Sequence, residues 1–435
     1  MNILHICAHL GGGVGKAHAV LAEASRDEPA DGGRHLCHTY VLLEEPRDTT
    51  FVRRIAEAGG HIVVRPGSMR LCDLVEAADV VQVEWWNHPR VYHSLATTPL
   101  PAMRLALWVH ISGLGQPLIP AGLLAEADRT LFTSPCSLEA TNLLPLVEAR
   151  PEVFGIANSG FGFASPQRRV SPRQPLRYGY LGTLDFIKMH PAIFDVIDAM
   201  DGGVRVSMWG HLDPTGEVAA RAASMRYPER IRFEGYANDP RTVLKGIDVF
   251  FYLLSPGHYG TGENALVEAM SMGAPPIVWD NPAERDIVCD GRNGFVVGDV
   301  AQCASLLDRI RQNPGEVAKL AAVAAADMAR SRAPAITLGV FAETYARLAA
   351  QPRRRRDFAA ALGRNSRAWF LSSLRADPQE AGRRDSAHLL SESRSKGSIG
   401  HFRACFPDDP SLAPSVGSEP WQTSRPRNET RTIAS

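Results

Sequence analysis

The chain has 435 residues, 45% of them hydrophobic, and its 47 basic and 47 acidic side chains cancel to a formal net charge of zero. This length allows two or three domains with sizeable cores, and the balanced charge disfavours nucleic-acid binding through a global excess of positive charge. The 7 scattered cysteines include no CxxC pair, which argues against a zinc knuckle or a disulfide framework and fits a reducing cytoplasm. Residues 1–9 are typical of a strand rather than a signal peptide, and no apolar run approaches the roughly 20 residues that span a bilayer.

Strand and helix signals alternate along the first half of the chain. The apolar run 2–9 predicts a strand, the glycine-rich stretch 10–15 a turn, and residues 16–24 a helix. Further strands are expected at 38–44, 61–65, 79–85, 104–110 and 130–134, and further helices at 49–58, 69–77, 88–96, 121–127 and 136–144. This alternation predicts a mainly parallel sheet with helices on both faces, whose ligands lie beyond the carboxyl ends of the strands.

The glycine-rich turn matches neither common nucleotide motif. A P-loop needs Gly where Leu10 stands and Ser or Thr where Ala17 stands, and the dinucleotide fingerprint places its last glycine on Lys16 or His18. Two interpretations stay open, namely a tight connection between strand and helix, or a turn whose glycines approach a ligand closely.

Two strand ends in this half carry polar and aromatic residues. Glu84 is followed by Trp85 and Trp86, and His110 ends the strand at 104–110. His110 can act on a ligand or can be a satisfied core histidine. Glu84 can bind a ligand or cap the next helix, and the two tryptophans can stack on a sugar ring or belong to the core.

A second series of strands and helices begins after the Pro-rich stretch 165–175, which is the best candidate for a domain boundary. Strands are expected at 176–182, 204–209, 231–235 and 249–254, and helices at 191–200, 216–226, 240–247, 300–313, 314–332 and 334–350. The sequence therefore predicts an α/β protein with two doubly wound, Rossmann-like domains that face each other across a cleft.

The stretch 255–299 carries the clearest chemistry. An apolar strand runs into a loop with Gly257, Gly260 and Gly262, then into a helix at 264–270, and a second apolar strand begins at Pro276. Glycines and a helix N-terminus together form a seat for phosphate, because they present unpaired backbone N–H groups. The carboxylates of Glu263 and Glu268 would repel a phosphate but would accept hydrogen bonds from hydroxyls, which indicates a nucleotide linked to a sugar.

The run Glu268-Ala-Met-Ser-Met-Gly-Ala-Pro resembles the donor-binding segment of the retaining glycosyltransferases of family 4, which have the GT-B fold. In that family a first Glu stands eight positions before the second, where this chain has Gly260, and the nearby carboxylate here is Glu263. The segment 178–191 resembles the part of the family in which a Gly-Arg pair and a Lys hold the donor diphosphate. Lys188 stands at the Lys position, and Thr183 takes the place of the Arg.

The resemblance implies a retaining transferase that moves a sugar from a nucleotide-sugar donor to a glycan, lipid-linked or small-molecule acceptor, without a metal or cofactor. The expected catalytic residues are His110, Glu263 and Lys188. The expected donor-binding residues are Gly12, Gly13, Gly182, Thr183, Lys188, Gly260, Thr261, Gly262, Glu263, Asn264, Ala265 and Glu268. Two alternatives are a sugar-nucleotide-binding or scaffold protein that has lost catalysis and, because both glycine loops fail the fingerprint, a less favoured NAD(P)-dependent oxidoreductase.

The expected organisation is an acceptor domain at 1–170, a donor domain at 171–333, a final helix at 334–350 that crosses back to the first domain, and a tail at 351–435. Residues 353–374 combine arginines with Phe358, Trp369 and Phe370, a composition that suits peripheral contact with an anionic membrane or a solvated linker. From Ala376 onward the composition is typical of a disordered tail. No nucleic-acid partner is expected.

Overall fold

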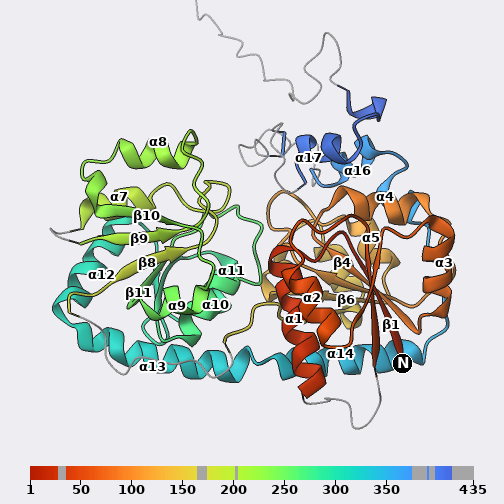
Figure 1. Ribbon diagram of the computed structural model, residues 1–435, viewed down its shortest axis with the longest axis horizontal. Helices are drawn as coiled ribbons and strands as arrows, with labels where there is room; N and C mark the ends of the chain where they lie inside the picture. The colour runs from red at the N-terminus through yellow and green to blue at the C-terminus, as the bar shows by residue number, and fades with distance from the viewer. Residues whose placement is uncertain (28–35, 164–173, 201–203, 375–388, 391–396, 414–435) are drawn as a thin grey trace, which may run out of the picture.

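The computed structural model describes residues 1–27, 36–163, 174–200, 204–374, 389–390 and 397–413. It has two α/β domains side by side, and the long helices α13 (Pro314–Ser331) and α14 (Pro334–Ala349) run along one edge of both (Figure 1). The expected domain boundary at 165–175 lies largely outside the described residues. Among the described helices, none combines the length and the hydropathy needed to cross a membrane.

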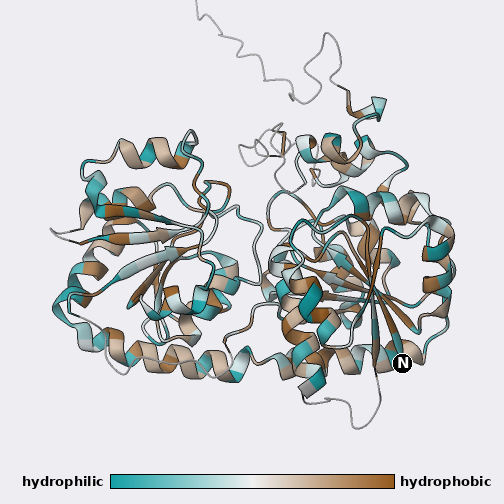
Figure 2. Cartoon of the chain, viewed as in Figure 1, coloured by the Kyte–Doolittle hydropathy of each residue, from teal (hydrophilic) through white to brown (hydrophobic). Residues whose placement is uncertain are grey.

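The first domain contains a seven-stranded sheet in the order β3-β2-β1-β4-β5-β6-β7, in which every strand pair is parallel. Its strands are β1 (Asn2–Cys7), β2 (Cys37–Leu42), β3 (His61–Val64), β4 (Val80–Trp85), β5 (Leu105–Val109), β6 (Arg129–Phe132) and β7 (Phe154–Ile156). Its helices are α1 (Gly12–Asp27), α2 (Thr50–Glu57), α3 (Ser68–Ala77), α4 (Pro89–Thr97), α5 (Ala121–Glu126) and α6 (Leu144–Ala149). The central strands β4 and β5 are buried along their whole length, because helices cover both faces of the sheet (Figure 2).

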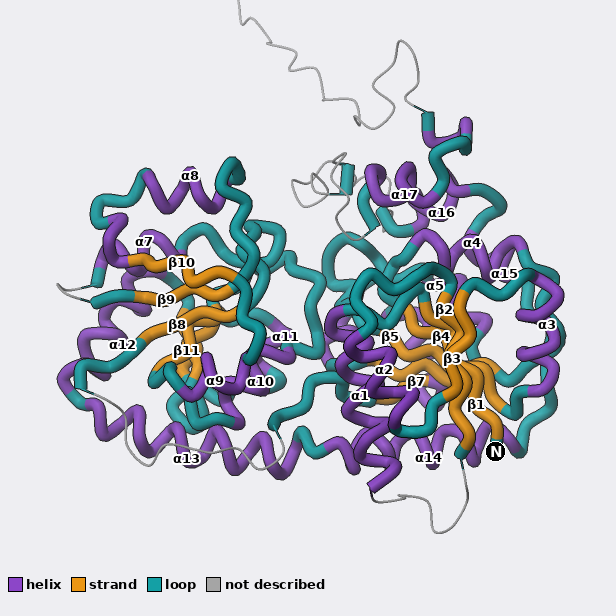
Figure 3. Tube along the Cα trace, viewed as in Figure 1, coloured by secondary structure: helices purple, strands orange, loops and turns teal. Residues whose placement is uncertain are grey.

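The second domain contains a six-stranded parallel sheet in the order β10-β9-β8-β11-β12-β13. Its strands are β8 (Tyr178–Leu181), β9 (Val206–Trp209), β10 (Ile231–Gly235), β11 (Val249–Tyr252), β12 (Pro276–Trp279) and β13 (Phe295–Val297). Its helices are α7 (Ile193–Ala199), α8 (Glu217–Ala223), α9 (Pro240–Lys245), α10 (Asn264–Ser271), α11 (Pro282–Arg285) and α12 (Val300–Gln312). Figure 3 shows how helices enclose the strands of each sheet.

The strand order fixes where ligands can bind. Strand order reverses between β1 and β4 in the first sheet and between β8 and β11 in the second. At such a reversal the connections leave in opposite directions, so a crevice opens at the carboxyl ends of the two strands. The glycine-rich turn after β1 and the glycine loop after β11 both lie at these reversals, so the topology places both at ligand-binding edges.

Four elements differ from the sequence prediction. Helix α1 begins at Gly12 rather than residue 16, so the glycines form its first turn instead of a preceding loop. The helix expected at 136–144 is a short 3-10 turn (Pro135–Glu139) followed by α6, since Pro145 lacks an N–H and is favoured in the first turn of a new helix. Strands β7 and β13 have only three residues each, too few for a periodic pattern to be recognised.

Helix α14 leaves the second domain and packs on the first, against α1 and β4. Its side chains Phe341, Tyr345 and Leu348 join a cluster of buried apolar residues that includes Ile3 and Trp108 of the first sheet. The chain beyond α14 continues over the same domain, so the first domain is built from both ends of the sequence.

Membrane contact of the segment at 353–374 is not shown, and its largest apolar side chains are covered by protein. The segment forms α15 (Phe358–Leu362) and α16 (Ser366–Ser372), which pack against α4 and α5. The side chains of Phe358, Trp369 and Phe370 are buried in the core of the first domain.

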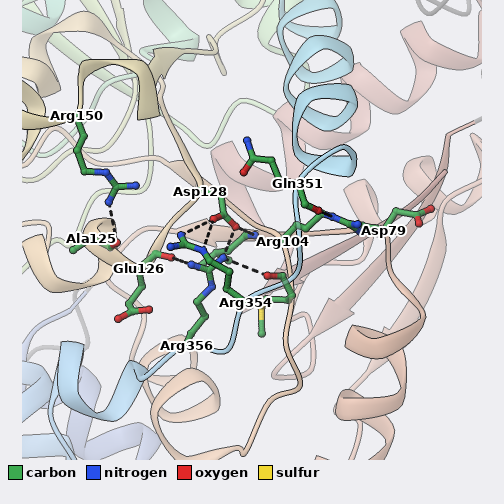
Figure 4. Close-up of polar contacts among 11 residues, drawn as sticks. Asp79, Arg104, Ala125, Glu126, Asp128, Arg150, Gln351, Arg354 and Arg356 are labelled. Carbon is green, nitrogen blue, oxygen red and sulfur yellow. Dashed lines mark hydrogen bonds and ion pairs between the residues drawn. The ribbon is translucent and has the colours of Figure 1, made fainter.

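Arginines in this segment fasten it to the first domain (Figure 4). The buried carboxylate of Asp128 accepts hydrogen bonds from Arg354 and Arg356 and from the backbone N–H of Leu105. Arg356 also donates to the carbonyl oxygen of Glu126 at 2.6 Å. Arg354 and Arg356 therefore make intramolecular contacts with the first domain.

The expectation of disorder from Ala376 onward is wrong for residues 397–413. They include helix α17 (Ile399–Cys405) and a 3-10 turn (Pro410–Leu412), and the helix packs on α4. Phe402 of α17 is fully buried against the first domain. The other residues to which this expectation applied, apart from 389–390, lie outside the described part of the chain.

Candidate functional site

The first turns of α1 and α10 face each other from the two domains. Gly12 opens α1 with a φ of +63°, which glycine adopts without steric cost. A Cβ atom on Gly13 would lie 3.2 Å from Nδ2 of Asn264, the first residue of α10, so the two helix ends approach closely. Both helices direct unpaired N–H groups and the positive ends of their dipoles toward this region, which suits an anion.

An ion pair joins the same two helices. The ammonium group of Lys16 contacts Oε1 of Glu268, and the Glu268 side chain is 4% exposed against 25% for Lys16. Burial raises the pKa of the Glu268 carboxyl, and the charge and hydrogen bond of Lys16 offset part of that rise. Lys16 therefore helps to keep an acceptor carboxylate at the edge of the region between the helices.

A second buried carboxylate, Glu263, lies directly before α10. Its φ of +36° is in the left-handed region, which is uncommon for a residue with a side chain. The hydroxyl of Tyr252 donates to Glu263, and the ammonium group of Lys188 lies 3.2 Å from Oε2 of Glu263. Burial alone would raise the pKa of Glu263, but Lys188, His258 and Tyr252 outweigh burial and hold it below its usual value.

The Glu263 carboxylate in turn favours the charged form of Lys188. Burial would lower its pKa, but the Glu263 carboxylate outweighs this effect and raises it. The backbone around Lys188 is also fixed, because its carbonyl oxygen accepts a 2.8 Å hydrogen bond from the N–H of Ser255, which lies just after β11. The side chain remains 22% exposed. The result is a positioned cation beside the glycine loop.

The side chain of Glu263 reaches back across its own loop. A Cβ atom on Gly260 would lie 2.0 Å from Oε1 of Glu263, so glycine at 260 leaves the space that this carboxylate occupies. The Glu263 side chain has no exposed surface. Its contacts in this structure are with Lys188, Tyr252 and the loop.

Loops of the first domain contact the glycine loop of the second domain. The hydroxyl groups of Thr133 and Thr261 lie 2.5 Å apart, and the N–H of Ser112 donates to the carbonyl oxygen of Tyr259 at 3.1 Å. A Cβ atom on Gly160 would lie 1.8 Å from the carbonyl oxygen of Gly262, so backbones of the two domains touch at this point. The two domains thus meet directly at the loop predicted to bind the donor.

His110 lies two residues before Ser112, and the side chain of Glu84 contacts its ring. Its Nε2 atom lies 3.0 Å from Oε2 of Glu84, which is fully buried. Burial would raise the pKa of Glu84, but the neighbouring His18, His110 and His5 outweigh it and hold the pKa well below its usual range. An ionised Glu84 can only accept a hydrogen bond, so Nε2 of His110 carries the proton and donates. The Nδ1 atom of a neutral His110 then carries the lone pair. Of the two alternatives for Glu84, capping of the next helix is not observed, because His88 caps α4.

The remaining predicted residues flank this site. Gly182 and the exposed Thr183 follow β8, and the hydroxyl of Tyr180 donates to the carbonyl oxygen of Thr183 at 2.7 Å. Ala265 is half-buried in the first turn of α10. Trp85 and Trp86 are buried in the core of the first domain, so neither offers an exposed ring for a sugar.

Sequence reasoning missed Lys16, Tyr252 and His258. Lys16 could have been found from the sequence, because it lies one turn into a helix that begins with glycines. The other two are an aromatic residue at a strand end and a histidine in a loop, and their link to Glu263 depends on the left-handed turn that only the structure shows.

Three groups of side chains among the described residues could in principle ligate a metal: His5, His18 and Glu84; His9, Glu44 and His88; and His88, His401 and Cys405. In the last two, Nδ1 of His9, His88 and His401 each accepts a backbone N–H, so a neutral ring carries its proton on Nε2. A protonated Nε2 cannot bind a metal. In the first group, His5 is engaged on both nitrogens, by Glu84 and His38.

Residues 178–313 match the family model described as "Glycosyl transferases group 1". This segment covers β8 to the end of α12, and it includes Lys188, Glu263 and Glu268. A comparison with curated proteins gave no significant match.

Several solved structures resemble the whole two-domain arrangement. HepE of Anabaena in complex with UDP and glucose has a TM-score of 0.61 at 19% identity, covering 80% of this chain and 100% of that one. A glycosyltransferase from Rickettsia africae has a TM-score of 0.63 at 12% identity, with coverage of 81% and 99%. The apo form of the lipopolysaccharide outer core galactosyltransferase WaaB has a TM-score of 0.59 at 16% identity, with coverage of 79% and 100%. The chain therefore has the GT-B fold, as the sequence predicted.

Proposed function

We propose that this chain is a glycosyltransferase that transfers a sugar from a nucleotide-sugar donor to an acceptor hydroxyl with retention of anomeric configuration. The observation that carries the proposal is the pair of buried carboxylates at the start of α10, each neutralised by a lysine. Lys188 pairs with Glu263 and Lys16 with Glu268, within or opposite a segment that matches the glycosyltransferase family model. The solved complexes of HepE with UDP and UDP-glucose make UDP-sugars the first donors to test.

In this proposal the donor diphosphate lies between the N-termini of α1 and α10, close to Lys188. Backbone N–H groups of Gly12, Gly13, Asn264 and Ala265 and the loop at 260–262 supply hydrogen bonds, while Gly182 and Thr183 border the site from β8. Glu268 accepts hydrogen bonds from ribose hydroxyls, a role that needs its ionised form. Lys16 supports that form through the ion pair already described.

Catalysis consists of stabilising charge that develops as the glycosidic bond breaks. The bond between the anomeric carbon and the diphosphate oxygen breaks, and the acceptor oxygen bonds to the same face of the anomeric carbon. The acceptor proton passes to the departing diphosphate. Lys188 and the two helix ends stabilise the negative charge on the leaving group, and such fixed electrostatic contacts act most strongly in a water-poor cleft. No step in this scheme requires a divalent metal.

Glu263 and His110 have different parts in the scheme. The buried Glu263 carboxylate positions Lys188, which is its contact in the structure, and so acts on the donor through that lysine. His110 contacts the transferred sugar near the reacting carbon, with Glu84 fixing the orientation of its ring. Glycans, lipid-linked glycans and small hydroxylated molecules are the acceptor classes to test.

The test incubates the purified protein with UDP-, ADP- and GDP-sugars and follows release of the nucleoside diphosphate, with and without candidate acceptors. Proton NMR of the product then identifies the anomer. Transfer with inversion would overturn the retaining mechanism, and activity that is lost in excess EDTA and restored by magnesium would overturn the metal-free scheme. Binding of UDP without any turnover would instead favour the alternative of a protein that has lost catalysis.

A further inference from the structure

The described residues of the first domain border a cavity of about 430 Å³ that lies away from the interdomain cleft. It is lined by parts of the strands β1 and β2 and of the helices α1 and α14. The two helices lie side by side in Figure 1. His38 and Thr39 in its wall are near the amino end of β2, whereas the cleft is at the carboxyl ends of the strands. Its size is within the range of small-molecule sites, about 300–1,000 Å³.

The cavity wall is mainly apolar. Leu21 of α1 and Leu338, Phe341 and Ala342 of α14 supply aliphatic and aromatic surface. The ring of His38 lies in the same wall and belongs to a chain of buried hydrogen bonds. A compact apolar body with a single polar group suits such a wall, because a buried polar atom needs a partner.

The hydrogen-bond chain determines which polar group fits. Glu84 is an acceptor, so Nδ1 of His5, at 3.2 Å from Oε1 of Glu84, carries a proton. Nε2 of His5 then accepts from Nδ1 of His38 at 2.9 Å, which leaves Nε2 of His38 with a lone pair. Burial keeps both rings neutral, since it lowers the pKa of His5 and lowers that of His38 to about 3. A ligand group that contacts Nε2 of His38 must therefore donate a hydrogen bond to it.

The same chain leads to the cleft. Beyond His5 it continues through Glu84, whose second oxygen lies 3.0 Å from Nε2 of His110. Hydrogen bonds in such buried chains polarise one another, so a new donor at one end changes the electronic environment at the other. Helix α1 provides a second physical connection, because it lines the cavity and carries Lys16 at the cleft.

We propose that this cavity is a second small-molecule site, which takes a compact apolar ring bearing a hydroxyl group that donates to Nε2 of His38, and that its occupancy is transmitted through His5 and Glu84 to His110. The proposal does not depend on the transferase activity proposed above. Its test needs no nucleotide sugar, so the two can fail separately.

Phenol is the probe and anisole its matched control, since anisole has the same ring but no hydroxyl donor. Titration of the full chain, with ¹³C-labelled histidine followed by NMR, reports both ends of the chain of contacts. The signals of His38 and His110 are assigned from the variants His38→Phe and His110→Gln. We expect saturable binding of phenol, about ten-fold tighter than that of anisole, as one net hydrogen bond provides.

Two substitutions on α14 localise the binding. Ala342→Trp should fill the cavity and abolish phenol binding, whereas Ala335→Trp, at an exposed position of the same helix, should leave it unchanged. His38→Phe should remove the preference for phenol over anisole. Absence of saturable binding, equal affinity for the two probes in the unmodified chain, or phenol binding that survives Ala342→Trp would overturn the site. A His110 signal that moves no more with phenol than with anisole would overturn the transmission.

Discussion

Lys16, on the first helix of the chain, pairs with Glu268, which is 252 positions later on the helix that carries the glycine loop. The contact joins the two domains at the proposed donor site. It also places a cation from the first domain beside a carboxylate whose ionised form the proposed function requires. A donor that binds Glu268 through its ribose therefore meets both domains at once.

Lys16→Met should destabilise the protein by about 1–2 kcal/mol, because it leaves the buried Glu268 carboxylate without its charged partner. Urea unfolding measures the effect. Glu268→Gln removes the charge of the partner residue. In the double variant, the loss in free energy of unfolding should be smaller than the sum of the losses in the two single variants. Strict additivity of the two losses would show that the ion pair makes no contribution in solution.

Lys188→Met should reduce turnover by about 100- to 1,000-fold while weakening donor binding much less. The leaving diphosphate gains charge in the transition state, and loss of one fixed contact at such a centre typically costs about 2.7–4 kcal/mol. Lys319→Met, at an exposed position of α13, is the control for loss of a surface charge. A Lys188→Met enzyme within a few-fold of the unmodified one would mean that another group neutralises the diphosphate.

Gly260→Ala should impair turnover even though it adds only one methyl group. The new Cβ atom would occupy the space of Oε1 of Glu263 and displace the carboxylate that holds Lys188. Misplacement of a catalytic group by about 1 Å can cost on the order of 100-fold in rate. Gly315→Ala adds the same methyl group where no atom lies within 4 Å and should leave the rate unchanged. Equal rates for the two variants would contradict the assigned role of Glu263.

Arg356→Met should lower the free energy of unfolding by about 1–3 kcal/mol. The Arg356 side chain is 2% exposed and pairs with Asp128, which would keep only Arg354 and the N–H of Leu105 as partners. Arg355→Met, the neighbouring exposed position, is the control and should be close to neutral. If both variants unfold at the same urea concentration, the arginine contacts of the tail do not stabilise the first domain.

Acidification should destabilise the packed C-terminal segment through His401. Burial, together with the nearby His88, lowers the pKa of His401 from about 6.5 to about 3. Between these values the unfolded chain binds a proton that the folded chain does not, so the free energy of unfolding falls as pH falls. His401→Phe should make this fall shallower between pH 7 and pH 5, and His211→Phe, at an exposed histidine, should not. Identical pH dependence in all three proteins would exclude this contribution.

Periodicity predicted most of the fold because the strands of both sheets are buried apolar runs separated by amphipathic helices. The GT-B architecture followed from two such series. What periodicity could not predict was contact between distant residues. Glu263 looked like a donor ligand from its position at a helix start, but a left-handed turn directs its carboxylate to Lys188 and Tyr252.

The segment 353–374 is a second case in which the sequence pattern could not predict contacts between distant residues. Arginines alternating with aromatic residues at 353–374 suit a membrane surface and a protein surface equally well, since both bury the apolar face of a helix. The structure shows a contact between Arg354 of this segment and Asp128, which lies more than 200 positions away in the sequence. The charge of Lys16 was overlooked for a related reason, because its partner is on a helix of the other domain.

The placement of α14 to α17 on the first domain has a consequence for how the protein is made. The core of that domain contains Phe341, Phe358 and Phe402, which leave the ribosome only after the whole second domain has been synthesised. Domains usually fold in the order in which they emerge, but here the second domain can finish its core while the first still lacks part of its own. The nascent first domain therefore keeps exposed apolar surface until helices α14 to α17, which end at Cys405, have emerged and packed on it.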